Sequence, residues 1–412
     1  MQLPEEFMRE ARQLFGDERF ERYMRAFEEE PPVSIRLNPR KLKQGEWSVT
    51  DGEPVPWCPD GYYLSRRPQF TMDPLLHAGC YYVQEAASMF LWWALTHAQH
   101  SPFCTQPSAA LDLCAAPGGK STLLRSVLPE EWLLTSNEPN GKRCKVLAEN
   151  VSKWGYENHR VTNLYPRDFV KSGMRFPLIL CDVPCSGEGM FRKDAATISE
   201  WSPQNVEKCW RLQREIVCDA WQCLEEGGLI IYSTCTFNTK ENEENIRYFM
   251  EELGAEVLPV EGVKPEWNIT GSLLEGFHEP VYRFIPGTSR GEGLFMAVMR
   301  KKPHKPYKPH EPHKPHKPHE PHEPHEPHAP LTYQQAISYL RREAIVLPEG
   351  TPRGLVSVTF MGQPLGLVKN IGTRANNLYP KEWRIKTTYI PQEYEAILRH
   401  SEPHPDGGHR EG

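Results

Sequence analysis

Residues 110–122 read ALDLCAAPGGKST, which combines a short apolar strand, a glycine turn and the first residues of a helix. In doubly wound α/β folds this junction lies at the carboxyl end of the first strand, where a ligand can approach the backbone. Gly119-Lys120-Ser121 matches the end of a phosphate-binding loop, but Cys114 stands where that loop needs its first glycine. The G-x-G-x-x-G dinucleotide motif is absent as well. The turn therefore suits a nucleotide-like ligand without phosphate, such as S-adenosylmethionine, and a purely structural turn is the alternative.

Apolar runs alternate with helical patterns from about residue 80 to residue 300, which is typical of a parallel sheet with helices on both faces. The predicted strands are Ala109–Leu113, Leu133–Ser136, Val161–Leu164, Leu178–Cys181 and Leu229–Tyr232. Ser202-Pro203 predicts the start of a long helix, and we expect Gly227-Gly228 to end it. Residues Tyr282–Ile285 and Leu294–Met299 predict a final antiparallel hairpin at the sheet edge.

Two acidic residues follow the second and third predicted strands. Glu138 comes directly after the second strand, where a carboxylate can accept hydrogen bonds from ribose hydroxyls. Asp168 follows the third strand, where a carboxylate could meet the amino group of adenine. Either acid alone would more often be a surface residue. Together with the glycine turn they favour an adenosine-containing ligand.

Two cysteines follow the fourth and fifth strands, in Asp182-Val-Pro-Cys185 and in Ser233-Thr-Cys235. The carboxyl ends of parallel strands form the edge at which open α/β sheets bind ligands. A lone cysteine is usually a small core hydrophobe, but two of them at this edge indicate chemistry. A thiolate is the natural nucleophile for C6 of a pyrimidine. Its addition makes C5 a carbon nucleophile that can accept a methyl group from a sulfonium.

In these motifs the chain resembles the NOL/NOP/Sun family of RNA cytosine-C5 methyltransferases, in particular its bacterial RsmF-like members that act on 16S ribosomal RNA. The motifs are CAAPGGK at 114–120, DVPC at 182–185 and STC at 233–235. The resemblance implies a Rossmann-like class I methyltransferase domain that uses S-adenosylmethionine and an RNA substrate. It also implies that Cys235 is the nucleophile, that Cys185 helps to release the product and that Asp182 lies near the target base. The implied cofactor-binding residues are Cys114, Ala115, Ala116, Pro117, Gly118, Gly119, Lys120, Glu138, Asp168 and Asp182.

We expect four segments along the chain. Residues 1–75 predict a small α+β cap, because they begin with an amphipathic helix and continue into PVSIRLNPRK, and the resemblance implies that this cap recognises RNA. Residues 76–302 form the predicted methyltransferase domain. In residues 303–330 proline recurs every third position between histidines, lysines and glutamates, which indicates an extended linker. Residues 331–400, including GQPLGLVKNIGTRANNLYPKEWRIK, resemble the PUA-like RNA-binding domain of the same family.

Composition limits the other classes of protein. The chain has 412 residues and a net charge of −6, but residues 351–390 carry six basic residues against one acid, as a phosphate backbone would require. No signal peptide or membrane span is predicted, so we expect a cytoplasmic protein without an obligate protein partner. None of the eleven cysteines forms a C-x-x-C pair, and we expect no metal site. The alternatives are a transfer RNA methyltransferase, a DNA cytosine methyltransferase with its nucleophile in the Pro-Cys motif, and a non-catalytic RNA-binding assembly factor.

Overall fold

The computed structural model describes residues 3–99, 108–303, 327–387 and 389–401. These residues fold into two compact units that interleave along the first 82 positions. The first unit holds residues 3–34 and 55–61 together with the described residues from 83 to 303. The second unit holds 35–54, 62–82 and the described residues from 327 to 401. The predicted boundary at residue 75 stays a prediction, as do the limits of the methyltransferase domain.

An eight-stranded sheet is the framework of the first unit, and it confirms the predicted Rossmann-like α/β class. The strand order is β11-β13-β10-β9-β6-β7-β8, and β12 pairs with β13. The strands from β6 to β10 run parallel. Their bounds are β6 Ala109–Asp112, β7 Leu133–Asn137, β8 His159–Thr162, β9 Phe176–Asp182, β10 Leu224–Thr234, β11 Ala255–Leu258, β12 Tyr282–Phe284 and β13 Leu294–Lys301. All five predicted strands are present, although β8 begins and ends two residues earlier than predicted.

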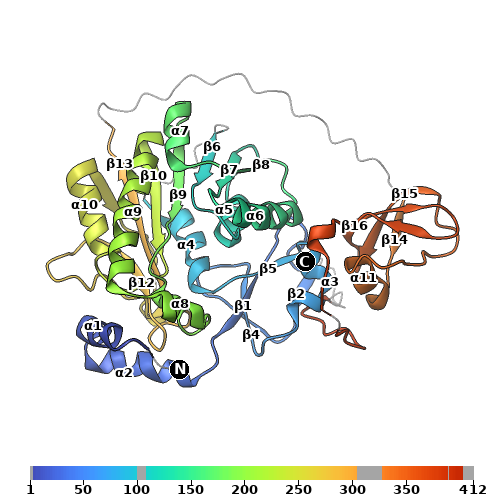
Figure 1. Ribbon diagram of the computed structural model, residues 1–412, viewed down its shortest axis with the longest axis horizontal. Helices are drawn as coiled ribbons and strands as arrows, with labels where there is room; N and C mark the ends of the chain where they lie inside the picture. The colour runs from blue at the N-terminus through green and yellow to red at the C-terminus, as the bar shows by residue number, and fades with distance from the viewer. Residues whose placement is uncertain (1–2, 100–107, 304–326, 388, 402–412) are drawn as a thin grey trace, which may run out of the picture. The chain divides into compact units, whose positions relative to one another are not determined.

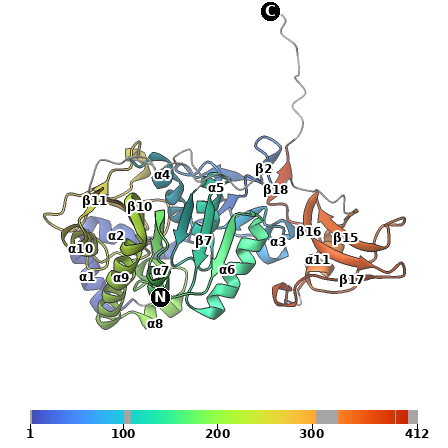
Figure 2. The same ribbon diagram turned by 90° about the horizontal axis from the view of Figure 1, so that it is seen from above.

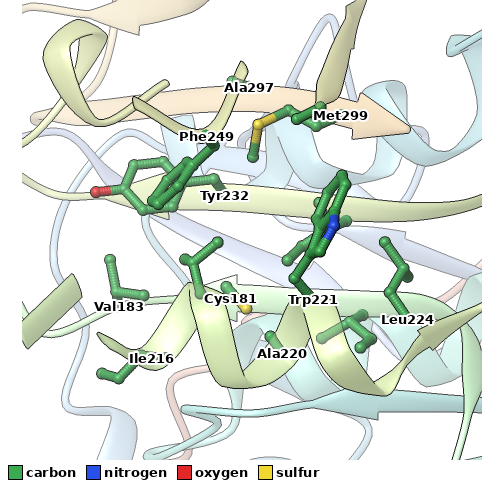
Figure 3. Packing of buried hydrophobic residues seen from close by; sticks show 14 of the residues in the cluster. Cys181, Val183, Ile216, Ala220, Trp221, Leu224, Tyr232, Phe249, Ala297 and Met299 are labelled. Carbon is green, nitrogen blue, oxygen red and sulfur yellow. The ribbon is translucent and has the colours of Figure 1, made fainter. Parts of the chain in front are cut away.

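Helices cover both faces of this sheet (Figures 1 and 2). On one face α4 packs on α5 and α5 packs on α6, while on the other α9 packs between α7 and α10. Their bounds are α4 Phe90–His97, α5 Gly119–Val127, α6 Gly141–Trp154, α7 Pro166–Ser172, α9 Pro203–Cys223 and α10 Glu243–Leu253. Figure 3 shows Ile216, Ala220 and Trp221 of α9 facing Cys181 and Tyr232 of the sheet, in the main hydrophobic core. This core fixes the strand ends that carry the candidate site.

The long helix α9 begins where the sequence predicts. The Ser202 hydroxyl accepts a hydrogen bond from the Asn205 backbone N–H at 3.1 Å, and Pro203 is the first helical residue. The prediction that Gly227-Gly228 ends the helix is wrong, because α9 ends at Cys223 and both glycines belong to β10. The Lys301 ammonium donates to the carbonyls of Trp221 and Leu224, so a side chain from β13 satisfies the end of the helix.

The predicted final hairpin is present, and its strand β12 lies at the sheet edge, where it pairs only with β13 among the named strands. Strands β12 and β13 pair in antiparallel fashion, as predicted. However, β13 lies between β10 and β11, and the sequence analysis did not predict β11. Because β11 is a four-residue strand that follows α10 after Gly254, its local pattern is too short to identify it.

The first two helices, α1 Glu5–Phe15 and α2 Asp17–Arg25, pack within the first unit. The predicted apolar stripe of α1 is confirmed: Phe7, Ala11 and Phe15 are buried, and Leu14 packs beside them. The Phe7 ring contacts the rings of Phe191 and Trp201 edge-on. These two helices therefore extend the core of the methyltransferase fold.

The second unit contains three small sheets, ordered β3-β4-β1-β5, β14-β15-β16-β17 and β18-β2. The strand and helix bounds are β1 Val33–Leu37, β2 Trp47–Val49, β3 Gly52–Pro54, β4 Gly61–Leu64, β5 Tyr81–Val83, β14 His328–Pro330, β15 Gly354–Phe360, β16 Gln363–Asn370, β17 Ala375–Asn377, β18 Leu398–His400, α3 Pro74–His77 and α11 Tyr333–Leu340. The C-terminal sheet begins at His328, three residues before the predicted start at 331. Most of the predicted linker, 304–326, lies outside the described residues. No described helix has the length and apolar composition needed to cross a membrane.

Candidate active site

The predicted site residues gather at the carboxyl ends of the parallel strands. Strands β6 and β9 are neighbours, although β7 and β8 come between them in the chain, so the direction of winding reverses at this point. Such a reversal opens a crevice between the loops that leave the two strands, and α/β folds bind ligands there. The CAAPGGK turn leaves β6, and Asp182 is the last residue of β9. The sequence prediction of a shared edge is therefore confirmed.

The structure brings the two predicted thiols into contact. The sulfurs of Cys185 and Cys235 lie 3.2 Å apart, and the Cys235 backbone N–H donates to the Cys185 sulfur at 3.3 Å. The hydrogen bond with Cys235, followed by burial, raises the pKa of the Cys185 thiol well above its ordinary value. Cys185 therefore keeps its proton at neutral pH and can donate a hydrogen bond to the neighbouring sulfur. A protonated thiol in contact with a second thiol is an arrangement suited to nucleophilic catalysis.

An ion pair lies at the ends of β9 and α5, beside the thiols. The Lys120 ammonium is 2.8 Å from Asp182 Oδ1, and the Ser233 hydroxyl donates to the same oxygen at 2.6 Å. Burial lowers the pKa of Lys120, but attraction and a hydrogen bond to Asp182 outweigh it, so the net pKa is raised. The charged form of Lys120 is thus retained. The Asp182 side chain keeps 31% of its surface exposed, so its carboxylate remains accessible to a substrate.

The glycine turn is held by the protein's own hydrogen bonds. Gly118 precedes α5 and has φ +117°, a backbone conformation that residues other than glycine rarely adopt. The Arg143 guanidinium donates to the Ala116 carbonyl at 2.7 Å, and the Asn150 amide donates to the Pro117 carbonyl at 2.8 Å. Helix α6 therefore fixes the path of the turn that follows β6.

Asp112, the last residue of β6, was missed by the sequence analysis. Its side chain is fully buried and accepts a hydrogen bond from the Ser121 hydroxyl. In the part of the chain that is described, its Oδ1 atom has no hydrogen-bond partner. Burial is the largest cause that raises the pKa of this carboxyl to about 7. The sequence did contain a signal for Asp112, because it is an acid inside the apolar run ALDL. Burying a carboxylate is costly unless it has a partner, so an acid in a buried strand indicates a functional role.

Glu138 lies where the sequence predicts, directly after β7, with only 3% of its surface exposed. The Asn140 backbone N–H donates to its Oε1 at 2.9 Å, and an Arg143 guanidinium nitrogen lies 3.3 Å from its Oε2. Each carboxylate oxygen can accept a second hydrogen bond, so a pair of hydroxyls can still be bound. These contacts therefore orient the Glu138 carboxylate and leave each of its oxygens able to accept a further hydrogen bond.

Asp168 has a local role that the sequence analysis did not consider. It is the third residue of α7, and its Oδ2 accepts the Tyr165 backbone N–H at 3.0 Å. The Lys171 ammonium lies 3.7 Å from the other oxygen. Capping the helix explains this acid without any ligand. Its place in cofactor binding stays a prediction.

Comparisons with known proteins match three stretches of the chain. Residues 104–300 match the family model described as 16S rRNA methyltransferase RsmB/F. Residues 3–86 match the N-terminal domain of 16S rRNA methyltransferase RsmF, and residues 326–385 match the methyltransferase RsmF PUA domain. The predicted C-terminal PUA-like fold is therefore confirmed.

The chain is also similar to individual proteins. Ribosomal RNA small subunit methyltransferase F of Cronobacter sakazakii is 34% identical over 286 residues, which are 65% of this chain and 56% of that protein. The chain spans less than two thirds of the length of this and further curated relatives. A solved methyltransferase homolog from Pyrococcus horikoshii is 26% identical, with a TM-score of 0.57 over 71% of this chain and 93% of that one. NSun6 from Pyrococcus horikoshii, solved with SFG, shares the fold at 20% identity, with a TM-score of 0.58 over 72% of this chain and 98% of that one.

Proposed function

Because this chain belongs to the RsmB/F family of methyltransferases, we propose that it transfers a methyl group from S-adenosylmethionine to C5 of a cytosine in 16S ribosomal RNA. The observation that carries the proposal is the contact between the Cys185 and Cys235 sulfurs beside the Lys120–Asp182 ion pair. A non-catalytic RNA-binding protein has no need for two thiols in contact at the ligand-binding edge of the sheet.

The residues at the carboxyl ends of β6, β7 and β9 fit S-adenosylmethionine. The turn after β6 offers a backbone that a ligand can approach, and Asp112 has a buried oxygen without a hydrogen-bond partner among the described residues. Glu138 presents a fixed carboxylate at the end of the next strand. We propose that these groups, with Cys114–Lys120 and Asp182, surround the cofactor, and that Asp168 meets its adenine. When bound, S-adenosylmethionine supplies an electrophilic methyl group.

The chain's own residues would carry out the remaining steps. The Cys235 thiolate forms a bond to C6 of the cytosine, and this makes C5 nucleophilic. Asp182, the last residue of β9 and the partner of Lys120, would hold the base. After C5 has accepted the methyl group its proton passes to a water molecule, the C–H electron pair re-forms the C5–C6 double bond, and the bond between Cys235 and C6 breaks to return the thiolate. Cys185, which remains protonated, would assist this release through its contact with the Cys235 sulfur.

The proposed substrate is RNA, bound in part by the C-terminal PUA domain. All six basic residues of the segment 351–390 are exposed, namely Arg353, Lys369, Arg374, Lys381, Arg384 and Lys386. Contacts between such side chains and phosphates supply affinity without reading the sequence. The family match favours ribosomal RNA, within a ribosomal subunit, over transfer RNA. Because this proposed substrate is found in the cytoplasm, we propose that the protein acts there.

Removing each thiol should block the reaction at a different step. Cys235→Ala should form no covalent complex with RNA and no 5-methylcytosine. Cys185→Ala should transfer the methyl group and then stall, giving a slow-migrating protein–RNA band on a denaturing gel. Adding Cys235→Ala to that variant should abolish the band, and Cys218→Ala, on the outer part of α9, should behave like the wild type. A trapped complex from Cys235→Ala would move the nucleophile to Cys185 and favour the logic of DNA cytosine methyltransferases.

Bisulfite sequencing of RNA identifies the substrate. RNA from cells that lack the protein should lose one or more 5-methylcytosines from 16S ribosomal RNA, and re-expression of the wild type should restore them. Loss from transfer RNA instead would replace ribosomal RNA as the substrate. No loss from any RNA, combined with no covalent band from Cys185→Ala, would contradict the proposed activity.

A further inference from the structure

Each loop that carries a catalytic thiol sends a buried carboxylate to the backbone of the other loop. From the Cys235 loop, Glu241 accepts the Ser186 backbone N–H at its Oε2 atom, at 3.0 Å. From the Cys185 loop, Glu188 accepts the backbone N–H groups of Phe237 and Asn238 at its Oε2 atom, at 2.7 and 3.0 Å. We call this reciprocal arrangement the carboxylate clasp. It joins the two loops on both sides of the thiol pair.

Further hydrogen bonds hold the two carboxylates themselves. The Asn238 side-chain amide donates to Oε1 of Glu188 at 3.0 Å and to Oε1 of Glu241 at 2.8 Å. The Trp201 indole N–H donates to Oε1 of Glu188 at 3.0 Å. Gln213 of α9 donates one hydrogen bond to Oε2 of Glu241 at 2.7 Å and another to the Pro184 carbonyl at 2.9 Å. The clasp is thereby anchored to the helix beneath it.

The clasp is costly to bury, which argues against a role in packing alone. The Glu188 residue is 3% exposed and Glu241 is fully buried. The donors named above are all uncharged, so hydrogen bonds have to compensate for the desolvation of two neighbouring carboxyl groups. Burial, followed by repulsion from Glu188, raises the pKa of Glu241 to about 7. Apolar side chains of the same size would avoid this desolvation, but they would leave the backbone N–H groups of the two loops without acceptors.

The clasp contacts lie within a few residues of both thiols. Ser186 directly follows Cys185, and Phe237 is the second residue after Cys235. A direct hydrogen bond between the loops, from the Gly189 backbone N–H to the Cys235 carbonyl at 2.8 Å, has the same effect. The backbone on the C-terminal side of each thiol is therefore tied to the opposite loop.

We propose that Glu188 and Glu241 are positioning residues that set the separation of the Cys185 and Cys235 sulfurs. The inference rests on the methyltransferase function proposed above and adds a device that keeps Cys185 beside the sulfur bonded to the base. Neither carboxylate touches the substrate in this role. Displacements of about 1 Å at a reacting group can cost two orders of magnitude in rate, so the clasp has a measurable effect on turnover.

The separation of the sulfurs can be measured without RNA or cofactor. Phenylarsine oxide bridges two thiols through one arsenic atom and releases water, so it binds tightly only where two sulfurs are held at the right spacing. The full chain should bind it through Cys185 and Cys235, and Cys185→Ala should reduce this to weak single-thiol binding. Glu188→Gln and Glu241→Gln should each weaken binding by at least about tenfold, because either orientation of the amide points its NH₂ group at donors of the clasp.

The matched control is Asp73→Asn in the second unit. Asp73 is also buried, and it accepts the Leu75 backbone N–H and the hydroxyls of Tyr81 and Tyr394. This variant should bind phenylarsine oxide like the wild type. If it weakens binding as much as the clasp variants do, or if both clasp variants bind like the wild type, the proposal is overturned. Where a glutamine variant does not fold, Glu188→Asp or Glu241→Asp takes its place with the same expectation.

Turnover separates the failure of the clasp from the failure of the proposed function. In methyl transfer to RNA, the clasp variants should lower kcat by at least about tenfold and leave KM for S-adenosylmethionine within twofold. A lower kcat with a matching rise in KM would indicate general damage and would overturn the positioning role. If the wild type does not methylate RNA but the clasp variants still lose arsenical binding, the clasp is supported and the proposed activity is contradicted. If the wild type methylates RNA and the clasp variants bind the arsenical like the wild type, the proposed activity is supported and the clasp is contradicted.

Discussion

Breaking the ion pair between Glu243 and Arg283 should be among the most destabilising single changes in the first unit. The Arg283 guanidinium donates to both Glu243 oxygens, at 2.7 and 2.9 Å, and both side chains are 0% exposed. The Glu243 carboxylate also accepts the Leu273 backbone N–H, and Arg283 donates to the Phe237 carbonyl at 3.1 Å. Glu243→Gln keeps the shape of the side chain and leaves the buried guanidinium without its counter-charge. Removing one partner of a buried pair costs about 3–5 kcal/mol.

Thermal unfolding tests this magnitude. For a unit of this size each kcal/mol lowers Tm by roughly 2–4 °C, so Glu243→Gln should lower it by roughly 6–20 °C. The double variant with Arg283→Met should recover much of the loss, because it removes the uncompensated charge. The matched control is Glu256→Gln, which breaks the partly exposed pair with Arg300 and should cost less than about 1 kcal/mol. If Glu243→Gln costs no more than Glu256→Gln, or if the double variant is less stable than either single one, the reasoning is refuted.

Three further outcomes are expected. A side chain at Gly189 would place its Cβ 2.5 Å from a backbone carbon, so Gly189→Ala should lower the free energy of unfolding by about 1–3 kcal/mol and reduce methyl transfer. The control Gly271→Ala, whose Cβ would have no atom closer than 4.0 Å, should change neither. The pKa of Asp112 is raised to about 7, so the folded state binds this proton more tightly than the unfolded state does. The free energy of unfolding, measured by urea titration, should therefore fall as pH rises from about 4 to 7. Asp112→Asn should reduce this fall by up to about 4 kcal/mol. Lys369→Gln with Arg374→Gln should weaken RNA binding and reduce the salt slope by about 1.5, while an unchanged slope would mean that neither side chain contacts a phosphate.

The sequence by itself determined the class of fold and the edge of the sheet that carries the chemistry. Apolar runs that alternate with helical patterns require a parallel sheet covered on both faces, and the carboxyl ends of such strands share one edge. The positions of Cys185, Cys235 and Glu138 at that edge follow from this rule alone. Helix α9 begins as predicted because the signal at Ser202-Pro203 is local: the capping hydroxyl and the proline act within the same turn.

Features that depend on distant residues cannot be predicted from local sequence patterns. Gly227 and Gly228 do not end α9, because the chain turns into β10 before it reaches them. Lys301, which is 80 and 77 positions away along the chain, binds the carbonyls of Trp221 and Leu224 at the end of the helix. Strand β11, which pairs with β13 beyond the part that β12 covers, was not predicted because its segment is too short. Asp168 caps its own helix, and no spacing rule tells a capping acid from one that binds a ligand.

Only the tertiary structure decided the distances on which the chemistry depends. Sequence order places Cys185 and Cys235 on neighbouring loops, but their 3.2 Å contact requires the loops to be joined, and Glu188 and Glu241 join them across about fifty positions of the chain. Hydrogen bonds between such distant positions leave no periodic pattern, because each involves one side chain and one backbone N–H. The burial of Asp112 is likewise a property of the assembled sheet. Local patterns determine which elements form, whereas separations of a few ångströms between distant side chains are set by packing.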